Sequence, residues 1–384
     1  MSLVSLSIPI PRVQLPGEFV CGEGGLVALR GLQGSRVAVI AGDSVLDNPA
    51  KYDAVCNSVK CHSLKVIRRS WSGEPGFGEF TAAMTEIEQF QPDVIVAVGG
   101  GGIIDAARFI WLLYEHPGVS LEQVRRPFNV PALRGKCRFV AIPSTVGSGA
   151  EASSSAVLYD ADSGQKVPIV THDFLPDLVI LDPLLLQDIP PALLLSTLCD
   201  ALSHTVEGYV SAIDNPMVDS YAEKALQLIA RNWQGAVAGE VEALLQLQIA
   251  ASYAGIVQNH CVVGITHAIA HQMTRFGISH SDANGMLLQA GIRFNAANAD
   301  TAQKLQRLAL NAGIGQGLED VLALVESING QRAALVDHGA EINALQQSLK
   351  DDAVIDAAVG DNAARFNPVE VTADAVRSVI GAAL

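Results

Sequence analysis

The chain has 384 residues, of which 49% are hydrophobic and 17% are charged, and its formal net charge at pH 7 is −15. This length and composition suit a globular enzyme with two domains, each with a substantial core. The acidic balance argues against nucleic acid or an anionic membrane surface as the main partner, because phosphates would be repelled, although a local pocket can still hold a phosphorylated cofactor.

The sequence shows no targeting or membrane segment. No uninterrupted apolar run is long enough to span a bilayer, and the first residues lack the basic and apolar regions of a secretory signal. The cysteines are scattered and form no CxxC pair; they are Cys21, Cys56, Cys61, Cys137, Cys199 and Cys261. We therefore expect reduced thiols and a cytoplasmic protein.

Four short apolar runs rich in β-branched residues occupy the first half, at residues 35–41, 94–98, 138–143 and 178–181. Their apolarity is continuous, which indicates strands covered on both faces, as in a parallel sheet. The intervals have room for crossover helices. The sequence therefore predicts a doubly wound α/β domain, which binds ligands outside the carboxyl ends of its strands.

The second half changes character from about Pro190 onward, where Ala, Leu, Gln and Glu recur at helical spacing. Residues 222–229 and 241–247 are examples. We place the boundary so that residues 1–187 form the α/β domain and residues 188–384 form an all-helical domain. The charges from about Ile314 onward are most simply a solvated helix face.

A run of four glycines, residues 99–102, follows one predicted strand and precedes a helix expected from Asp105 to Leu113. Glycines let a backbone approach a ligand closely, and the free amides of a helix N-terminus hold phosphate. The alternative is a tight turn without a ligand, but consecutive glycines are costly in entropy, which favours a bound phosphate. The run is not the GxGxxG fingerprint, so it does not predict a standard dinucleotide fold.

A second glycine-containing turn, residues 143–151, carries Ser144, Thr145 and Ser148. Its hydroxyls and amides are suited to holding part of a nucleotide. Equally, Ser148 could cap a nearby helix, with Glu151 as the return partner of a capping box. The spacing leaves both interpretations open. Lys166 lies in a hairpin-like turn, where an exposed lysine is the ordinary expectation.

Side chains that bind metal ions gather in the second half. Asp200 and His204 are four residues apart, so on a helix they share one face. Taken alone, such a pair is more often a helical hydrogen bond or ion pair. His267 and His271 repeat the spacing, and His280 follows. One aspartate and three histidines would make a four-ligand site suited to iron(II) or zinc.

Together these motifs resemble the iron-containing (group III) alcohol dehydrogenase family along most of the chain. The Asp-Ala-Leu-x-His-x-x-Glu motif of that family runs from Asp200 to Glu207, and Asn367-Pro368 matches its tail. The resemblance implies a dehydroquinate synthase-like architecture, with an N-terminal dinucleotide-binding domain and a C-terminal metal-binding domain. It also implies an active site in the cleft between the domains.

The resemblance assigns roles to individual residues. It implies metal ligation by Asp200, His204, His267 and His280. It implies that His271 flanks the nicotinamide and the substrate, and our hypothesis is that His271 relays a proton. Nucleotide contacts are implied for Gly100, Gly101 and Gly102 at the pyrophosphate, for Ser144, Thr145 and Ser148 in the nucleotide cleft, and for Lys166 near the ribose. Glu207 is either a partner that orients a ligand or a structural ion pair.

Some positions depart from the pattern of the family. Gly102 stands where serine is usual, Arg108 stands where lysine is common, and Ser279-His280-Ser281 replaces Pro-His-Gly, with Asp282 adding a carboxylate nearby. At the end of the second strand, a carboxylate would bond the ribose diol and favour NAD. Asp43 is near that end and favours NAD, whereas a register that places Gly42 there admits NADP; we favour Asp43 slightly.

The expected function is therefore hydride transfer between NAD or NADP and a small alcohol or aldehyde, assisted by one divalent ion, Fe²⁺ or Zn²⁺, in a homodimer. The nearest alternative is a metal-free reductase of an acidic substrate, as in maleylacetate reductases. The intact set of four ligands argues against it. A lyase on the related fold and a non-enzymatic ligand-binding protein are more distant alternatives.

Overall fold

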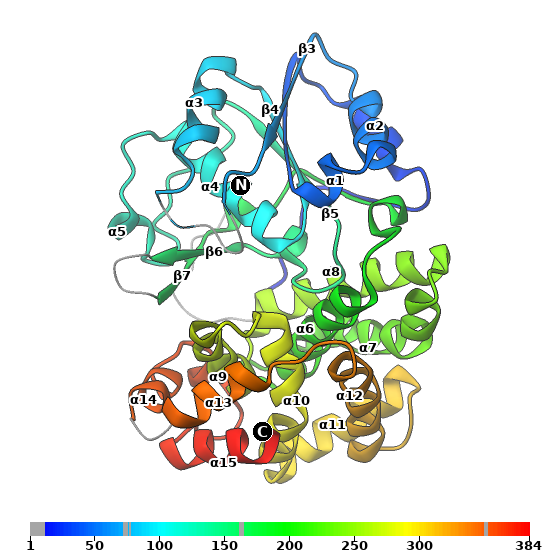
Figure 1. The fold of residues 1–384 in the computed structure, drawn as a ribbon, viewed down its shortest axis with the longest axis vertical. Helices are drawn as coiled ribbons and strands as arrows, with labels where there is room; N and C mark the ends of the chain where they lie inside the picture. Colours follow the sequence, from blue (N-terminus) through cyan, green and yellow to red (C-terminus); the bar gives the residue numbers. More distant parts are fainter. Residues whose placement is uncertain (1–11, 72–75, 77, 161–164, 349–351) are drawn as a thin grey trace. The chain divides into compact units, whose positions relative to one another are not determined.

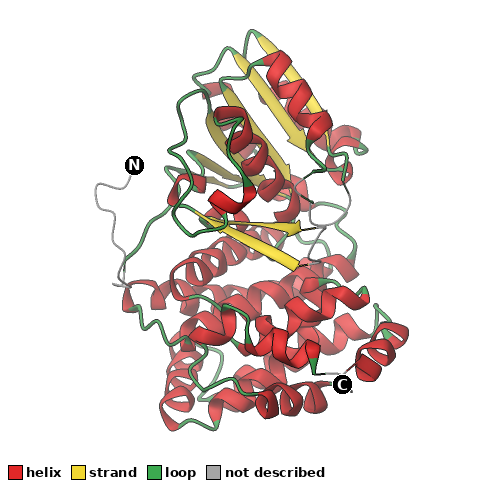
Figure 2. Cartoon of the chain, turned by 90° about the vertical axis from the view of Figure 1, so that its left-hand side faces the viewer, coloured by secondary structure: helices red, strands yellow, loops and turns green. Residues whose placement is uncertain are grey.

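The computed structural model describes residues 12–71, 76, 78–160, 165–348 and 352–384. These residues divide into two compact units (Figure 1). The first unit contains residues 14–145 and 149–187, and the second contains residues 188–384 with Arg12, Val13 and residues 146–148. Figure 2 shows the strands of the first unit and the helices of the second.

The first unit is built on a parallel sheet of six strands in the order β1-β8-β5-β4-β2-β3. The strands are β1 (Phe19–Cys21), β2 (Arg36–Ala41), β3 (Ser63–Arg68), β4 (Val94–Gly99), β5 (Arg138–Pro143) and β8 (Leu178–Leu181). The four predicted strands are confirmed as β2, β4, β5 and β8. The two that the sequence did not reveal, β1 and β3, are the partly exposed edge strands: β1 has only 3 residues, and polar residues interrupt the apolar ones of β3.

Alternate residues of the central strands face two separate cores. Ala38 and Ile40 pack into one core with helix α4 (Gly101–Glu115), while Val37 and Val39 pack into the other with η1 (Gly25–Gly31) and α2 (Pro49–Ser58). Both faces of the sheet are therefore covered, as the continuous apolar runs predicted. The remaining helices of this unit are α1 (Asp43–Leu46), α3 (Thr81–Phe90) and α5 (Leu121–Val124), with the 3₁₀ turns η2 (Ala150–Ala152), η3 (His172–Phe174) and η4 (Pro183–Leu186).

A separate antiparallel pair, β6 (Ser155–Asp160) and β7 (Gln165–Val170), flanks the predicted hairpin turn. Residues 162–164 of that turn lie outside the described residues. Lys166 itself lies on β7 opposite Tyr159 and is half-buried. The expectation of an exposed turn lysine was therefore wrong, because the strand begins earlier than its polar sequence suggested.

The second unit is helical. Its helices are α6 (Pro191–Val210), α7 (Pro216–Val237), α8 (Val241–Cys261), α9 (Ile265–Met273), α10 (His280–Ala296), α11 (Ala299–Ala312), α12 (Leu318–Ala333), α13 (Gly339–Ser348), α14 (Ala353–Val359) and α15 (Ala373–Ala383), with the 3₁₀ turns η5 (Thr274–Phe276) and η6 (Ala363–Phe366). This confirms the predicted all-helical region. In the described part of the chain, no helix combines the length and apolarity needed to cross a bilayer.

Helix α6 is the central element of this unit, and every residue from Leu198 to Val210 is buried. It packs against α7, α8, α10 and α12. Pro191 at its first turn has no amide hydrogen to leave unpaired and has the backbone angle that a helix start requires. Because α6 is covered on all sides, each charged residue on it needs a partner within the protein.

Candidate functional site

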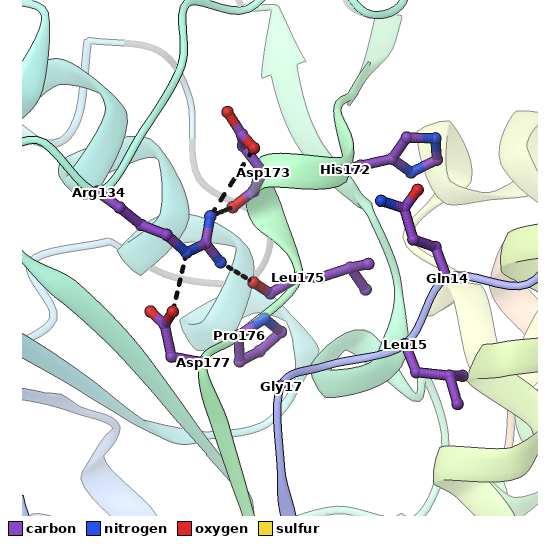
Figure 3. A pocket seen from close by; sticks show the side chains of 9 residues that line it. All are labelled: Gln14, Leu15, Gly17, Arg134, His172, Asp173, Leu175, Pro176 and Asp177. Atoms are coloured by element: carbon purple, nitrogen blue, oxygen red, sulfur yellow. Dashed lines mark hydrogen bonds and ion pairs between the residues drawn. The ribbon is translucent and has the colours of Figure 1, made fainter. Parts of the chain in front are cut away.

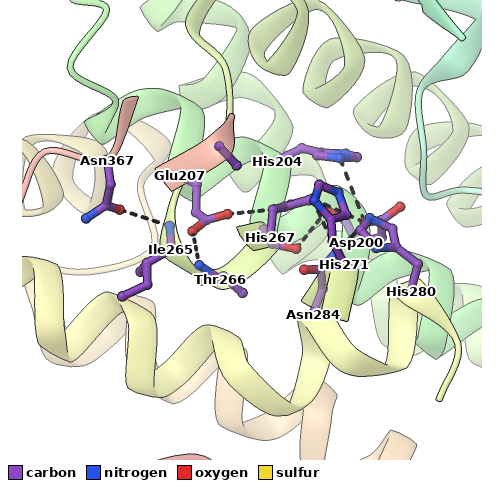
Figure 4. Close-up of polar contacts among 12 residues, drawn as sticks. Asp200, His204, Glu207, Ile265, Thr266, His267, His271, His280, Asn284 and Asn367 are labelled. Carbon is purple, nitrogen blue, oxygen red and sulfur yellow. Dashed lines mark hydrogen bonds and ion pairs between the residues drawn. The ribbon is translucent and has the colours of Figure 1, made fainter. Parts of the chain in front are cut away.

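Asp200 and three histidines meet inside the second unit (Figure 4). Asp200 Oδ1 lies 3.8 Å from His204 Nε2, 3.7 Å from His267 Nε2 and 3.6 Å from His280 Nε2. The ligand atoms of Asp200, His204 and His267 all lie within 4.8 Å of one another. The structure thus brings the four predicted metal ligands together. His280 joins the other three through its approach to the Asp200 carboxylate.

Three helices supply these ligands. Asp200 and His204 are one turn apart on α6, and the ring of His204 stacks on that of His267 with centroids 4.8 Å apart. Helix α9 begins two residues before His267, where Asn367 Oδ1 accepts a hydrogen bond from Ile265 N at 3.1 Å. This contact explains the tail motif that contains Asn367, since it fixes the start of the helix that carries His267.

Glu207 bonds directly to a metal-ligand candidate. Its Oε2 lies 2.6 Å from His267 Nδ1, and its Oε1 accepts a hydrogen bond from Thr266 N at 2.7 Å. The carboxylate holds a ring proton on Nδ1, so Nε2, which faces Asp200, is the nitrogen that a neutral His267 would offer to a metal. Of the two interpretations of Glu207, the structure therefore supports the partner that orients a ligand.

Burial and neighbouring charges give the two stacked histidines, His204 and His267, different protonation states. Burial lowers the pKa of His204 to about 4, so its ring is neutral near pH 7. Burial would also lower the pKa of His267, but the nearby carboxylates of Asp200 and Glu207 outweigh it and raise that pKa to about 9. Although burial opposes it, the neighbouring imidazoles of His204, His280 and His267 lower the pKa of Asp200.

This donor set fits a divalent cation. In the metal-free site, protonated His267 is the positive charge between the buried carboxylates of Asp200 and Glu207. A cation bound by the Nε2 atoms would take the place of that proton. One carboxylate and three imidazoles are the ligand types that iron(II) and zinc accept.

Asn284 is a site residue that sequence reasoning missed. Its Nδ2 donates to Asp200 Oδ1 at 2.8 Å and lies 3.2 Å from Nε2 of both His267 and His280. The side chain is fully buried. Its position four residues after His280 on α10 was the available signal, because that spacing shares a helix face.

Asp282, the additional carboxylate of the sequence, is not turned toward these ligands. It accepts hydrogen bonds from Ser196 Oγ at 2.8 Å, Ser279 Oγ at 2.6 Å and Arg332 Nη1 at 2.8 Å. Ser279 in turn caps α10 by accepting from Asp282 N. The departure from the family pattern around His280 is therefore a buried network that fixes the start of α10.

His271 lies beside the cluster but bonds elsewhere. Its Nδ1 is 2.9 Å from Asp361 Oδ2, and its ring stacks on that of His280 with centroids 5.2 Å apart. About 29% of the His271 side chain is exposed, whereas His267 is buried. His271 thus has a carboxylate partner, a metal-ligand neighbour and access to solvent.

The glycine run occupies the carboxyl end of β4. Gly100 caps α4, and Gly101 and Gly102 are its first two residues, so their amides belong to a helix N-terminus without intrahelical acceptors. Ser144 N donates to Gly99 O at 3.0 Å, and a Cβ on Gly100 would lie 3.2 Å from Thr145 Cγ2. The two predicted nucleotide turns are therefore adjacent at Gly100, Ser144 and Thr145.

Ser148 belongs to the second unit with Val146 and Gly147. A Cβ on Gly147 would lie 2.7 Å from Thr197 O, so this loop approaches α6 too closely for a side chain. The 3₁₀ turn that follows has Gly149 at its N-cap position, so the capping interpretation of Ser148 stays a prediction.

Two other charged residues are fixed by neighbours. Asp43 is the first residue of α1, and its carboxylate accepts hydrogen bonds from Arg68 and Arg69. Arg108 is fully buried, and it donates to Asp105 and to the backbone oxygens of residues 150, 153, 155 and 174. Arg108 therefore supports the chain that follows the second turn.

A pocket elsewhere in the first unit is drawn in Figure 3. It is lined by Gln14, Leu15, Gly17, Arg134, His172, Asp173, Leu175, Pro176 and Asp177. Arg134 donates there to Asp177 Oδ1 at 2.8 Å and to Asp173 O at 2.9 Å. None of the predicted metal or nucleotide residues in the described part of the chain lines it, so it is separate from the candidate site.

Comparison with known proteins agrees with this fold. Residues 16–183 match the model of the iron-containing alcohol dehydrogenase family, and residues 194–384 match the C-terminal model of the Fe-containing alcohol dehydrogenase family. The NADPH-dependent butanol dehydrogenase of Clostridium saccharobutylicum is 30% identical over 376 residues, which cover 96% of each chain. The 1-propanol dehydrogenase PduQ of Salmonella typhimurium is 28% identical over 371 residues, or 94% of this chain and 96% of that protein.

Solved structures are also similar. The iron-containing alcohol dehydrogenase of Thermococcus thioreducens superposes with a TM-score of 0.85 at 27% identity, covering 97% of this chain and 99% of that chain. A 1,3-propanediol oxidoreductase has the same fold, with a TM-score of 0.87 at 24% identity and coverage of 98% and 100%.

The chain belongs to the iron-containing alcohol dehydrogenase family. It is an NAD(P)-dependent oxidoreductase of the alcohol dehydrogenase class, and the resemblance, the fold class and the enzyme class expected from the sequence are confirmed.

Proposed function

We propose that this enzyme transfers a hydride between NAD(P) and a small alcohol or aldehyde, with one divalent ion, Fe²⁺ or Zn²⁺, held by Asp200, His204, His267 and His280. The observation that carries the proposal is the approach of three imidazole Nε2 atoms to one buried carboxylate oxygen, at 3.6–3.8 Å. The names of the relatives, a butanol dehydrogenase and a 1-propanol dehydrogenase, support short alcohols as the substrate class.

When bound, the cation supplies a Lewis acid for the substrate oxygen, and the nicotinamide supplies or accepts the hydride. The residues of the chain determine the net charge of the metal site and which nitrogen of His267 faces the metal. Three neutral imidazoles and one carboxylate leave a divalent site with net positive charge, and Glu207 keeps His267 in the tautomer that offers Nε2.

His271 is our candidate for the proton relay. Its ring stacks on His280, its Nδ1 bonds Asp361, and part of it reaches solvent. A proton lost from or gained by the substrate hydroxyl requires a path to water, and His271 combines the group and the exposure that such a path needs.

For the nucleotide, we propose that the amides of Gly100, Gly101 and Gly102 hold the pyrophosphate at the N-terminus of α4. Ser144 and Thr145 lie next to that turn and are proposed to add hydroxyl contacts. The same proposal gives Ser148 and Lys166 contacts to the nicotinamide and ribose portions.

Isotope transfer tests the function directly. Enzyme loaded with Fe²⁺ or Zn²⁺ would be incubated with propanal or butanal and with NADH or NADPH deuterated at C4. We expect deuterium on C1 of the alcohol, measured by mass spectrometry, and loss of transfer after chelation. Transfer that continues in the metal-free enzyme, and only to acidic keto substrates, would favour the metal-free reductase instead.

A further inference from the structure

Three neighbouring strands of the first unit, β4, β2 and β3, have their carboxyl ends at the same end of the sheet (Figure 1). Ala41 at the end of β2 pairs with Arg68 on β3 and with Val98 on β4. Beyond these pairs, Arg69 N donates to Ala41 O at 3.3 Å, and Gly42 N donates to Val98 O at 3.3 Å. Gly42 therefore follows β2, the strand next to β4 and its glycine turn, whereas the two arginines stand at the end of β3, one strand further away.

The carboxylate of Asp43, at this end of the sheet, already accepts hydrogen bonds from two arginines. Asp43 Oδ1 accepts from Arg68 Nη1 at 2.6 Å, and Asp43 Oδ2 accepts from Arg69 Nε at 3.1 Å and Nη2 at 2.9 Å. Arg68 Nη2 also donates to Asp47 at 2.7 Å. The arginines hold the pKa of Asp43 below its usual range, which agrees with a fixed ion pair. Asp43 is thus held as an anchor for two guanidinium groups, which limits its use as an acceptor for a ribose diol.

Gly42, the residue directly at the strand end, carries no side chain, although the space would admit one. Its backbone is extended, with φ −85° and ψ 167°, and a Cβ there would make only an ordinary contact with Ile103 at 3.4 Å. The position could therefore hold an aspartate that repels a 2′-phosphate and bonds a diol, and this chain has none.

We infer that Arg68 and Arg69 form a subsite for a phosphomonoester, the 2′-phosphate of the adenosine ribose, so that the enzyme prefers NADP(H) to NAD(H). The inference rests on the proposed nucleotide site at α4 and adds its selectivity. It replaces the slight preference for NAD that the position of Asp43 in the sequence had suggested.

The chemistry of the two side chains suits this ligand. A guanidinium presents several N–H donors in a planar fork that matches a phosphate, and the bonds to Asp43 and Asp47 use only part of each fork. The Arg68 side chain is 48% exposed and that of Arg69 is 31% exposed, so a ligand can reach both. Because their other donors are tied to carboxylates, the arginines lose little conformational entropy when an anion binds.

The test compares nucleotides that differ only in the 2′-phosphate, on the full chain. Calorimetry would give Kd values for 2′,5′-ADP and 5′-AMP, which carry no nicotinamide and so report binding apart from turnover, and cofactor fluorescence would give them for NADPH and NADH. The variants are R68A/R69A and G42D, which keeps a good helix cap. Lys65→Ala is the matched control, because it removes an exposed cation of the same strand whose partner is Glu86.

We expect wild type and Lys65→Ala to bind 2′,5′-ADP about ten- to a hundred-fold more tightly than 5′-AMP, as charge-assisted hydrogen bonds allow. R68A/R69A should lose that difference while keeping its affinity for 5′-AMP, and G42D should reverse it. Equal affinities in wild type, or tighter binding of 5′-AMP, would overturn the subsite. Failure of all four nucleotides to bind would instead contradict the proposed nucleotide site itself.

Discussion

Glu207 and His267 are joined by the short contact of 2.6 Å between a carboxylate Oε2 and an imidazole Nδ1, and both side chains are buried. The contact fixes which nitrogen of His267 faces Asp200. We predict that Glu207→Gln lowers metal affinity about ten- to a hundred-fold, because the amide supports the ligand less strongly than the carboxylate. Competition with a chromogenic chelator measures this change. Glu223→Gln, at a carboxylate bonded to Tyr209, is the control and should keep wild-type affinity.

Asn284 should contribute to the same site. Its amide donates to the Asp200 oxygen that the three histidines approach, so Asn284→Ala removes a hydrogen bond to a buried charge. We expect metal affinity to fall about ten- to a hundred-fold, since such a bond is worth about 1.5–3 kcal/mol. The control is Asn311→Ala, whose amide bonds Glu223 at an exposed position. Unchanged metal affinity in Asn284→Ala would remove Asn284 from the site.

His271 is predicted to act on turnover without holding the metal. His271→Ala should lower kcat about 10²–10⁴-fold, the usual contribution of a positioned acid or base, while metal content stays at the wild-type level. Asp361→Asn should cause a smaller loss, because it weakens only the bond that orients the ring. Full turnover of His271→Ala at every pH tested would refute the relay, and loss of metal would make His271 a ligand.

Arg108 should be needed for the stability of the first unit. A lysine is common at this position in the family, but Arg108→Lys would leave several of its buried carbonyl partners without a donor. We expect destabilisation of about 2–4 kcal/mol in denaturant melts, with weaker nucleotide binding and unchanged metal content. Arg138→Lys is the control, since its side chain is 61% exposed and should tolerate the change. Wild-type stability in Arg108→Lys would show that the network is dispensable.

The metal-free protein should be most stable near pH 6.5, as far as His204 and His267 determine it. His267 has a pKa of about 9 when folded, against 6.5 for the free side chain, so its stabilisation is complete below pH 6.5 and is lost as the pH rises through 9. His204 has a pKa of about 4 when folded, so its contribution is complete above pH 6.5 and is lost as the pH falls toward 4.

Melting temperatures measured between about pH 5 and about pH 9 test this profile. Bound metal should remove the alkaline decline, because metal-ligating histidines are already deprotonated. His267→Gln should remove it as well. A melting temperature of the metal-free protein that is constant or rising above pH 7 would contradict the assignment of the proton to His267.

The sequence predicted the buried parts of this protein well, because burial leaves a pattern. The strands β2, β4, β5 and β8 are apolar on both faces, which made them visible as continuous apolar runs. The four candidate ligands were predicted from helical spacing and one family motif. The edge strands β1 and β3 were missed, since half of each faces solvent.

Contacts between distant segments left no signal in the sequence. Nothing in the order of residues indicates that Asn367 caps the helix that carries His267. Nor does it indicate that Arg68 and Arg69 donate hydrogen bonds to Asp43. The departure at Asp282 was visible in the sequence, but its partners Ser196 and Arg332 are 86 and 50 residues away. Such contacts depend on tertiary packing, which a single sequence does not reveal.

The most direct test of the account is the number of metal ions per chain, measured by elemental analysis on protein purified without air, chelator or histidine tag. The account predicts about one iron or zinc per chain, and loss of that metal in His267→Ala with the fold retained. The absence of metal, even after incubation with iron(II) or zinc, would contradict the four-ligand centre, and a metal-free reductase of acidic carbonyl substrates would then be the better description.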